Sequence, residues 1–172
     1  MKKSGNILSK LDFNTILNGV TKRIERSCIE HYSVGCLLLG NRHRAKIIGE
    51  LLYRRMSIHT IDVIASPNAS PKQLALSMLH ALGIRDAAIK TESQINDQLF
   101  SCLKERAIKL IVINESDNLF GLSHSAGSAA ANRWLNNLFN LGGMAICLIG
   151  ATVLHGHLDE QITKRITDGY FI

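Results

Sequence analysis

The sequence predicts a doubly wound α/β domain with a mainly parallel central sheet that helices cover on both faces. Short apolar runs alternate with helical patterns along the 172 residues. Three of these runs are nearly continuous, as strands buried on both faces require: Val34–Leu39, Ile108–Ile113 and Met144–Ile149. Ligands of such folds bind beyond the carboxyl ends of the strands. Gly40, Asn114 and Gly150, which directly follow the three runs, therefore mark a candidate site.

The first half of the chain is expected to alternate helix and strand. In order, we expect a helix over 11–30, the strand 34–39, a helix over 44–56, a strand over 59–65 and a helix over 71–82. Ser70 before Pro71 is a typical N-cap followed by a proline at the first helical position. Gly83 is expected to end that helix.

The second half continues the alternation. In order, we expect a helix over 91–106, the strand 108–113, a small polar loop over 121–128, a helix over 129–141, the strand 144–149, a helix over 157–166 and a short strand over 169–172. The chain shows no repeat and no obvious linker. We therefore expect a single folded domain, made of a helical leader over 1–33 and an α/β core over 34–172.

Composition restricts the function classes. The net charge of +6 fits a partner that carries phosphates. No apolar run approaches the roughly 20 residues of a membrane span, and no signal peptide is indicated, so no membrane contact and a cytoplasmic location are expected. The four cysteines form no C-x-x-C pair and are expected to be reduced. His155 and His157 lack partners at zinc spacing, so no metal site is expected there.

The segment after the first buried strand is similar to the nucleotide-binding loop G-x-x-x-x-G-K-[ST]. Its candidate phosphate-binding residues are Gly40, Asn41, Arg42, His43, Arg44, Ala45, Lys46 and Ile47. Gly40 and Lys46 have the required spacing. Ala45 replaces the second glycine, and Ile47 replaces the hydroxyl that would hold Mg²⁺. The basic residues 42–44 either capture an anion at a helix N-terminus or fill an empty phosphate site.

A second motif follows the strand 108–113. Nucleotide hydrolases place an acidic pair there: the first carboxylate holds the Mg²⁺ shell and the second orients water. Here Glu115 stands at the second position, whereas Asn114, which carries no charge, stands at the first. Ile47 and Asn114 both remove a Mg²⁺ interaction, so ATP hydrolysis is expected to be weak or absent.

Several segments together resemble the AAA+ regulators of DNA transposition, of the TniB, TnsC and MuB type. The segments that carry the resemblance are the loop at 40–47, the stretch 66–83, the strand and acid at 111–119, Leu135–Leu138, the strand end Leu148–Thr152 and the segment Gln161–Ile166. The resemblance implies a three-layer P-loop sandwich. It also implies ATP-controlled oligomers that wrap DNA and link a target-site selector to a transposase. The family's helical lid would start where the chain ends at Ile172, so we expect the lid to be absent.

The resemblance also implies roles for individual residues. Lys46 would contact phosphates, Glu115 would be the catalytic glutamate and Thr152 a sensor. Arg165 would reach a neighbour's nucleotide across a subunit interface. Ala45, Ile47 and Asn114 depart from the family pattern.

We therefore expect a bacterial, nucleoid-associated accessory protein of transposition. It would oligomerise with AAA+ subunits and contact DNA, without sequence preference, together with a transposase and a target selector. ATP binding would be weak, Mg²⁺ binding is in doubt, and the protein would be a pseudo-ATPase. Two alternatives stay open: an active Mg²⁺-dependent ATPase with an atypical metal site, and a non-enzymatic module that caps an intact AAA+ partner through the Arg165 face.

Overall fold

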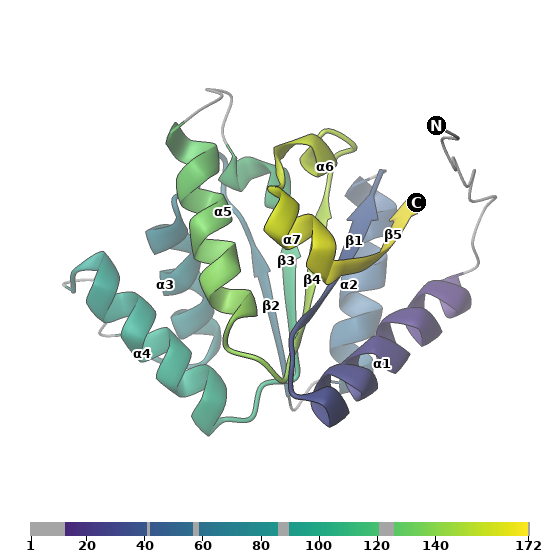
Figure 1. Cartoon of the computed structure of the whole chain (residues 1–172), viewed down its shortest axis with the longest axis horizontal. Coiled ribbons are helices and arrows are strands. Elements are labelled where there is room, and N and C mark those ends of the chain that lie inside the picture. Colours follow the sequence, from purple (N-terminus) through teal and green to yellow (C-terminus); the bar gives the residue numbers. More distant parts are fainter. Residues whose placement is uncertain (1–12, 41, 57–58, 86–89, 121–125, 172) are drawn as a thin grey trace.

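A computed structural model describes residues 13–40, 42–56, 59–85, 90–120 and 126–171 (Figure 1). The elements in chain order are α1 Phe13–Glu30, β1 Val34–Leu39, α2 Arg42–Met56, β2 Thr60–Ile64, α3 Pro71–Ala81, α4 Glu92–Glu105, β3 Leu110–Asn114, the 3-10 turn η2 Ser116–Leu119, α5 Ala126–Phe139, β4 Ala145–Gly150, α6 Leu154–His157, α7 Glu160–Arg165 and β5 Ile166–Phe171.

The five strands form one parallel sheet in the order β2-β3-β4-β1-β5. This confirms the predicted α/β class. Leu39 lies opposite Gly150, and Ile64 lies opposite Asn114, so the carboxyl ends of these strands lie at one edge of the sheet.

The sheet separates two hydrophobic cores, which explains why its strands are apolar along their whole length. In β1, Leu37 and Leu39 belong to the core beneath α3, α4, α5 and α7, whereas Cys36 and Leu38 belong to the core beneath α1 and α2 (Figure 1). The buried residues of α1 pack with α2 in this second core, so α1 covers the sheet directly.

Capping side chains set the starts of several helices. Ser70 is the N-cap of α3, as predicted, and it also forms a capping box with Gln73. The expected helix over 157–166 is two helices, because Asp159 accepts a hydrogen bond from the N–H of Ile162 (2.8 Å) and starts α7 anew. The last strand begins at Ile166, three residues earlier than expected. None of the helices in the described part of the chain is long and apolar enough to cross a membrane.

Candidate functional site

Three strand ends meet at the carboxyl edge of the sheet, as predicted. The N–H of Gly40 donates a hydrogen bond to the carbonyl oxygen of Gly150 (3.2 Å), and Gly40 has a φ of 134°. The carboxylate of Asp117 in η2 accepts a hydrogen bond from the N–H of Ala151 (3.1 Å). A side chain at Gly150 would place its Cβ only 2.7 Å from Oδ1 of Asp117, so a larger residue here would have to displace that carboxylate.

The loop between β1 and α2 is shorter than the sequence motif suggests. A phosphate-binding loop keeps the residues between its two glycines outside the helix, so that their N–H groups surround the phosphates. Here α2 begins at Arg42, and positions 42–45 already lie in its first turn. Lys46 is exposed on α2 and Ile47 is partly buried. Among the described residues of this segment, the main-chain donors that can face an anion are therefore the N–H groups of the first turn of α2.

Some residues of the predicted loop cannot be placed in full. Asn41 lies outside the described residues. For Arg42, His43, Arg44 and Ala45 the structure describes the backbone, and their side chains lie outside the description.

Asn114 is bound to a carboxylate that the sequence analysis did not identify. Its amide nitrogen Nδ2 donates to Oδ1 of Asp62 on the neighbouring strand β2 (2.5 Å) and to the carbonyl oxygen of Val63 (3.4 Å). Burial raises the pKa of Asp62; the hydrogen bond from Asn114 lowers it, and the nearby Glu50 charge raises it further. The sequence does carry one signal that could have identified Asp62: an acidic residue stands within the apolar run of a predicted strand.

Glu115 is held in an unusual backbone conformation directly after β3. Its φ of 53° and ψ of 39° are left-handed, which is uncommon for a residue other than glycine. Its Oε2 accepts a hydrogen bond from Nδ2 of Asn118 (3.1 Å), and the same amide donates to the carbonyl oxygen of Ala65 (2.8 Å). The acid is thus tied to the ends of both β2 and β3. Strained backbone of this kind is often found at functional sites.

The residues at this edge do not fit a Mg²⁺ ion held as in a P-loop enzyme. Ile47 offers no oxygen. Asn114 could offer a cation only its Oδ1, and this oxygen faces α2, where a Cβ at Gly49 would lie 3.2 Å from it. Its Nδ2, which donates to Asp62, cannot bind a cation. Within the described ranges, no three His, Cys, Asp or Glu side chains gather where a metal could bind.

The structure separates Arg165 from the other candidates. It is the last residue of α7 and precedes Ile166, which lies opposite Gly35 near the amino end of β1. Its Nη2 donates to Oδ1 of Asn140 (2.6 Å), and its guanidinium carbon lies 5.8 Å from the ring centre of Phe139. Thr152, in contrast, is exposed two residues beyond the carboxyl end of β4.

Comparison with known proteins identifies the family and the fold. The family model for the bacterial TniB protein matches residues 45–170, a span that begins at Ala45 and includes Lys46, Asn114 and Arg165. No curated protein matches the sequence significantly.

Three solved structures are similar in fold. The Aeropyrum pernix ORC2 protein in ADPNP–ADP complexes is 10% identical, with a TM-score of 0.65 over 92% of this chain and 47% of that chain. The Aeropyrum pernix ORC1 protein in complex with DNA is 15% identical, with a TM-score of 0.65 over 92% and 44%. The FIGL-1 AAA domain is 15% identical, with a TM-score of 0.56 over 94% and 52%. This chain thus spans about half of each, and at these identities the likeness shows the fold alone, that of a P-loop AAA+ domain.

Proposed function

This chain belongs to the bacterial TniB family, and on that premise we propose that it is an accessory protein of DNA transposition. It acts by assembly with AAA+ subunits and by contact with DNA, a transposase and a target selector. It binds ATP weakly and hydrolyses it slowly or not at all. The observation that carries the last point is the hydrogen bond from Asn114 to Asp62 at the position of a metal-holding acid.

The chemistry of phosphoryl transfer supports this proposal. A bound Mg²⁺ bridges the β- and γ-oxygens of a nucleotide and neutralises the charge that develops there. Ile47 and Asn114 supply no charged ligand for it. If the missing ion raises the barrier by about 4 kcal/mol, turnover falls about a thousandfold, since each 1.36 kcal/mol is a factor of ten. Lys46 and the first turn of α2 still offer positive charge to a phosphate.

The charge of the chain supports DNA as a partner. The net charge is +6, and Lys22, Arg54 and Lys104 are exposed on three different helices. Contacts of lysine and arginine to phosphates bind DNA without reading its sequence. We propose that the protein acts in the bacterial cytoplasm, at the nucleoid.

The first experiment is calorimetry of ATP binding to the full chain, with and without Mg²⁺, beside a Lys46→Ala variant. We expect weak binding that Mg²⁺ does not strengthen and that Lys46→Ala removes. Mg²⁺-dependent phosphate release that Lys46→Ala abolishes would overturn the proposal in favour of an active ATPase. In parallel, fluorescence anisotropy with a random duplex should show an affinity that falls steeply with salt. The absence of duplex binding at low salt would argue against DNA as a partner, and an affinity independent of salt would argue against phosphate contacts.

A second candidate function is a non-enzymatic module that binds an intact AAA+ partner. It is supported by the early start of α2 at Arg42, which leaves a short loop where a nucleotide would be cradled. Stable co-purification with an AAA+ subunit, without retention on immobilised DNA, would favour this candidate.

A further inference from the structure

The charge around β3 differs between the two edges of the sheet. At the carboxyl edge, Glu115 and Asp117 lie just beyond the strand. At the opposite edge, where the parallel strands begin and which we call the amino edge, Arg106 and Lys109 lie in the short segment before the strand. In Figure 1 the amino edge is at the bottom, where α4 ends. The charge beside β3 is therefore negative at one edge and positive at the other.

Two segments supply the positive charge of the amino edge. One is 53–59, the last turn of α2 with the connection to β2, and the other is 102–109, the last turn of α4 with the connection to β3. Together they contain five lysine and arginine residues and one acid, Glu105. The N–H of Lys109 donates to the carbonyl oxygen of His59 (2.8 Å), so the ends of the two segments lie side by side.

Main-chain contacts fix where these cations lie. The carbonyl oxygen of Lys109 accepts from the N–H of Ala145 (2.8 Å), so Lys109 is held between the starts of β2 and β4. Nη1 of Arg106 donates to the carbonyl oxygen of Leu82 (2.5 Å), which joins the end of α4 to the end of α3. A guanidinium has five N–H donors, so Arg106 keeps others for a ligand.

The cations of this edge are not neutralised within the described ranges. Arg54 and Lys104 are exposed, Lys109 is partly exposed, and none of the three has an ion pair or a side-chain hydrogen bond with another described residue. Lys164 on α7, in contrast, is paired with Glu160 (2.7 Å). The charge of the amino edge is therefore available to an anion from outside the chain.

Stabilisation of helix ends does not explain the whole cluster. A cation in the last turn of a helix interacts favourably with the negative end of its dipole, and this effect falls off within that turn. It accounts for Lys104 in α4 and for Arg54 in α2. Lys109 lies four residues beyond the end of α4, so the dipole does not account for it. A partly buried charge without a partner is unfavourable, and an external anion would offset that cost.

The spread of the cations fits a chain of phosphates better than one small anion. The starts of β2, β3 and β4 span two strand spacings, about 10 Å. A DNA duplex carries one negative charge per 1.7 Å of its axis, which makes about six over that length. A single phosphate would meet one or two of the cations, whereas a duplex can engage all four that the structure describes: Arg54, Lys104, Arg106 and Lys109.

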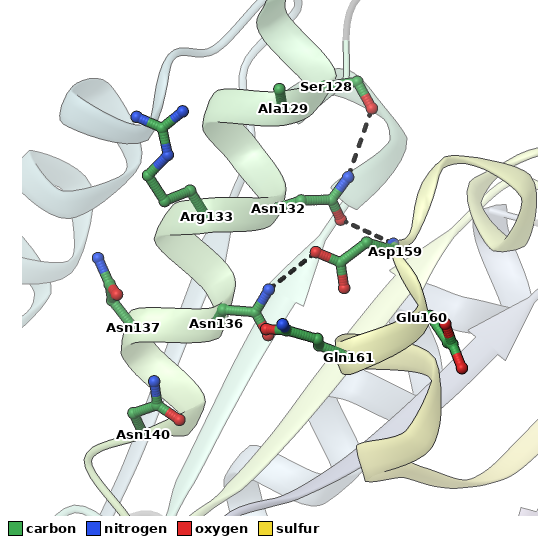
Figure 2. Close-up of a pocket in the computed structure, with 10 residues that line it drawn as sticks. All are labelled: Ser128, Ala129, Asn132, Arg133, Asn136, Asn137, Asn140, Asp159, Glu160 and Gln161. Carbon is green, nitrogen blue, oxygen red and sulfur yellow. Dashed lines mark hydrogen bonds between the residues drawn. The ribbon is translucent and has the colours of Figure 1, made fainter.

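The groove along α5 and α7 does not suit the same partner. It has a volume of about 780 Å³, and side-chain amides such as those of Asn136 and Asn137 dominate its lining (Figure 2). The lining contains one cation, Arg133, and two acids, Asp159 and Glu160. A phosphodiester backbone is bound by several lysine and arginine side chains. The charges therefore favour the amino edge over this groove.

We propose that the amino edge is the surface through which this protein binds the backbone of a DNA duplex. Arg54, Lys104, Arg106 and Lys109 contact phosphates and read no sequence. The inference rests on the proposed contact with DNA and deepens it by assigning the surface. This surface lies at the opposite edge of the sheet from the candidate nucleotide site, so DNA and nucleotide can bind at the same time.

The test is fluorescence anisotropy of the full chain with a labelled random duplex over a series of salt concentrations. Each of Arg54→Ala, Lys104→Ala and Lys109→Ala should lower the slope of log affinity against log salt by about 0.9, the value of one phosphate contact. The triple variant should lose affinity at least tenfold at low salt. A triple variant that keeps the charges, Arg54→Lys with Lys104→Arg and Lys109→Arg, should bind like the wild type. Circular dichroism checks that each variant is folded.

The matched control is Lys72→Ala, which removes the same charge from the first turn of α3, at the carboxyl edge. It should change neither the affinity nor the salt slope. A triple alanine variant that binds like the wild type would overturn this inference and leave the proposed contact with DNA standing. So would a loss in Lys72→Ala as large as that in Lys104→Ala. If the wild-type chain does not bind the duplex at low salt, the contact with DNA is itself wrong, and this inference falls with it.

A second measurement needs no substitution. Lysines of the wild-type chain are acetylated with and without the duplex, and the modified positions are identified by mass spectrometry. The duplex should protect Lys104 and Lys109 and leave Lys72 as reactive as before. Protection of Lys72 without protection of Lys104 and Lys109 would place the DNA at the other edge and overturn the inference.

Discussion

Restoring the acid at position 114 should destabilise this protein and should not make it an ATPase. In Asn114→Asp, a second carboxylate replaces the amide that donates to Asp62 at 2.5 Å. Two unit charges about 4 Å apart repel by about 4 kcal/mol at an effective dielectric constant of about 20, and by about half that where water enters. The lost charge-assisted hydrogen bond adds about 1.5–3 kcal/mol, but uptake of a proton by the pair limits the total. We expect the free energy of unfolding to fall by about 2–4 kcal/mol at pH 7 and by less near pH 5.

The assay is urea denaturation of four chains: the wild type, Asn114→Asp, Asp62→Asn and the double variant. The double variant reverses the hydrogen bond, so it should recover most of the stability and give a coupling energy above about 1 kcal/mol. An Asn114→Asp variant as stable as the wild type at pH 7, or a double variant as unstable as the sum of its parts, would refute the reasoning. So would Mg²⁺-dependent ATP hydrolysis gained by Asn114→Asp alone.

Three further outcomes follow from single contacts. Gly142→Ala should destabilise the protein more than Gly143→Ala. Both glycines have a positive φ (75° and 69°), which would cost an alanine about 1–2 kcal/mol. Of these two positions, only 142 would also place its Cβ 2.7 Å from the carbonyl oxygen of His31. Equal losses in thermal unfolding would contradict this. Ser70→Ala should lower the free energy of unfolding by about 0.5–2 kcal/mol, measured in urea, because the capping box is lost. The pKa of Asp62 is higher in the folded chain than its ordinary value of 3.8. The stability that this group contributes is therefore full below about pH 3.8, and it is lost as the pH rises through the pKa of the folded state. As the pH rises through this range, Asp62→Asn should therefore gain stability relative to the wild type. If urea unfolding shows that the free energies of unfolding of the two chains change with pH in parallel, this prediction is wrong.

The departures at Ile47 and Asn114 have different structural consequences. Ile47 is simply an apolar side chain without an oxygen. Asn114, in contrast, has a partner in this structure, since its amide joins β3 to β2 through Asp62. A single reversion at 114 therefore acts on a pair of residues, which is why the double variant is the informative one.

Most of the sheet could be predicted because its strands carry a local signal. A strand covered by helices on both faces has no polar face, so β1, β3 and β4 appear as apolar runs, and β1 was predicted to the residue. The edge strand β5 was harder to locate, because its first residue directly follows the last residue of α7. The start of α2 was predicted at 44 and lies at Arg42, because a motif match assumed an open loop.

The sequence by itself determined the fold class, the edge at which the strand ends meet, and the absence of an oxygen at position 47 and a charge at position 114. Hydrophobic periodicity and the chemistry of single residues are local properties, so they can be read directly from the amino-acid sequence. Only the tertiary structure decided that Asn114 meets Asp62, 52 residues earlier in the chain, that Arg165 lies against Asn140 and that the amides of α5 face a groove. These contacts depend on strand order and on how separate helices pack, and a side chain's distant neighbours are set by that packing rather than by its place in a local pattern.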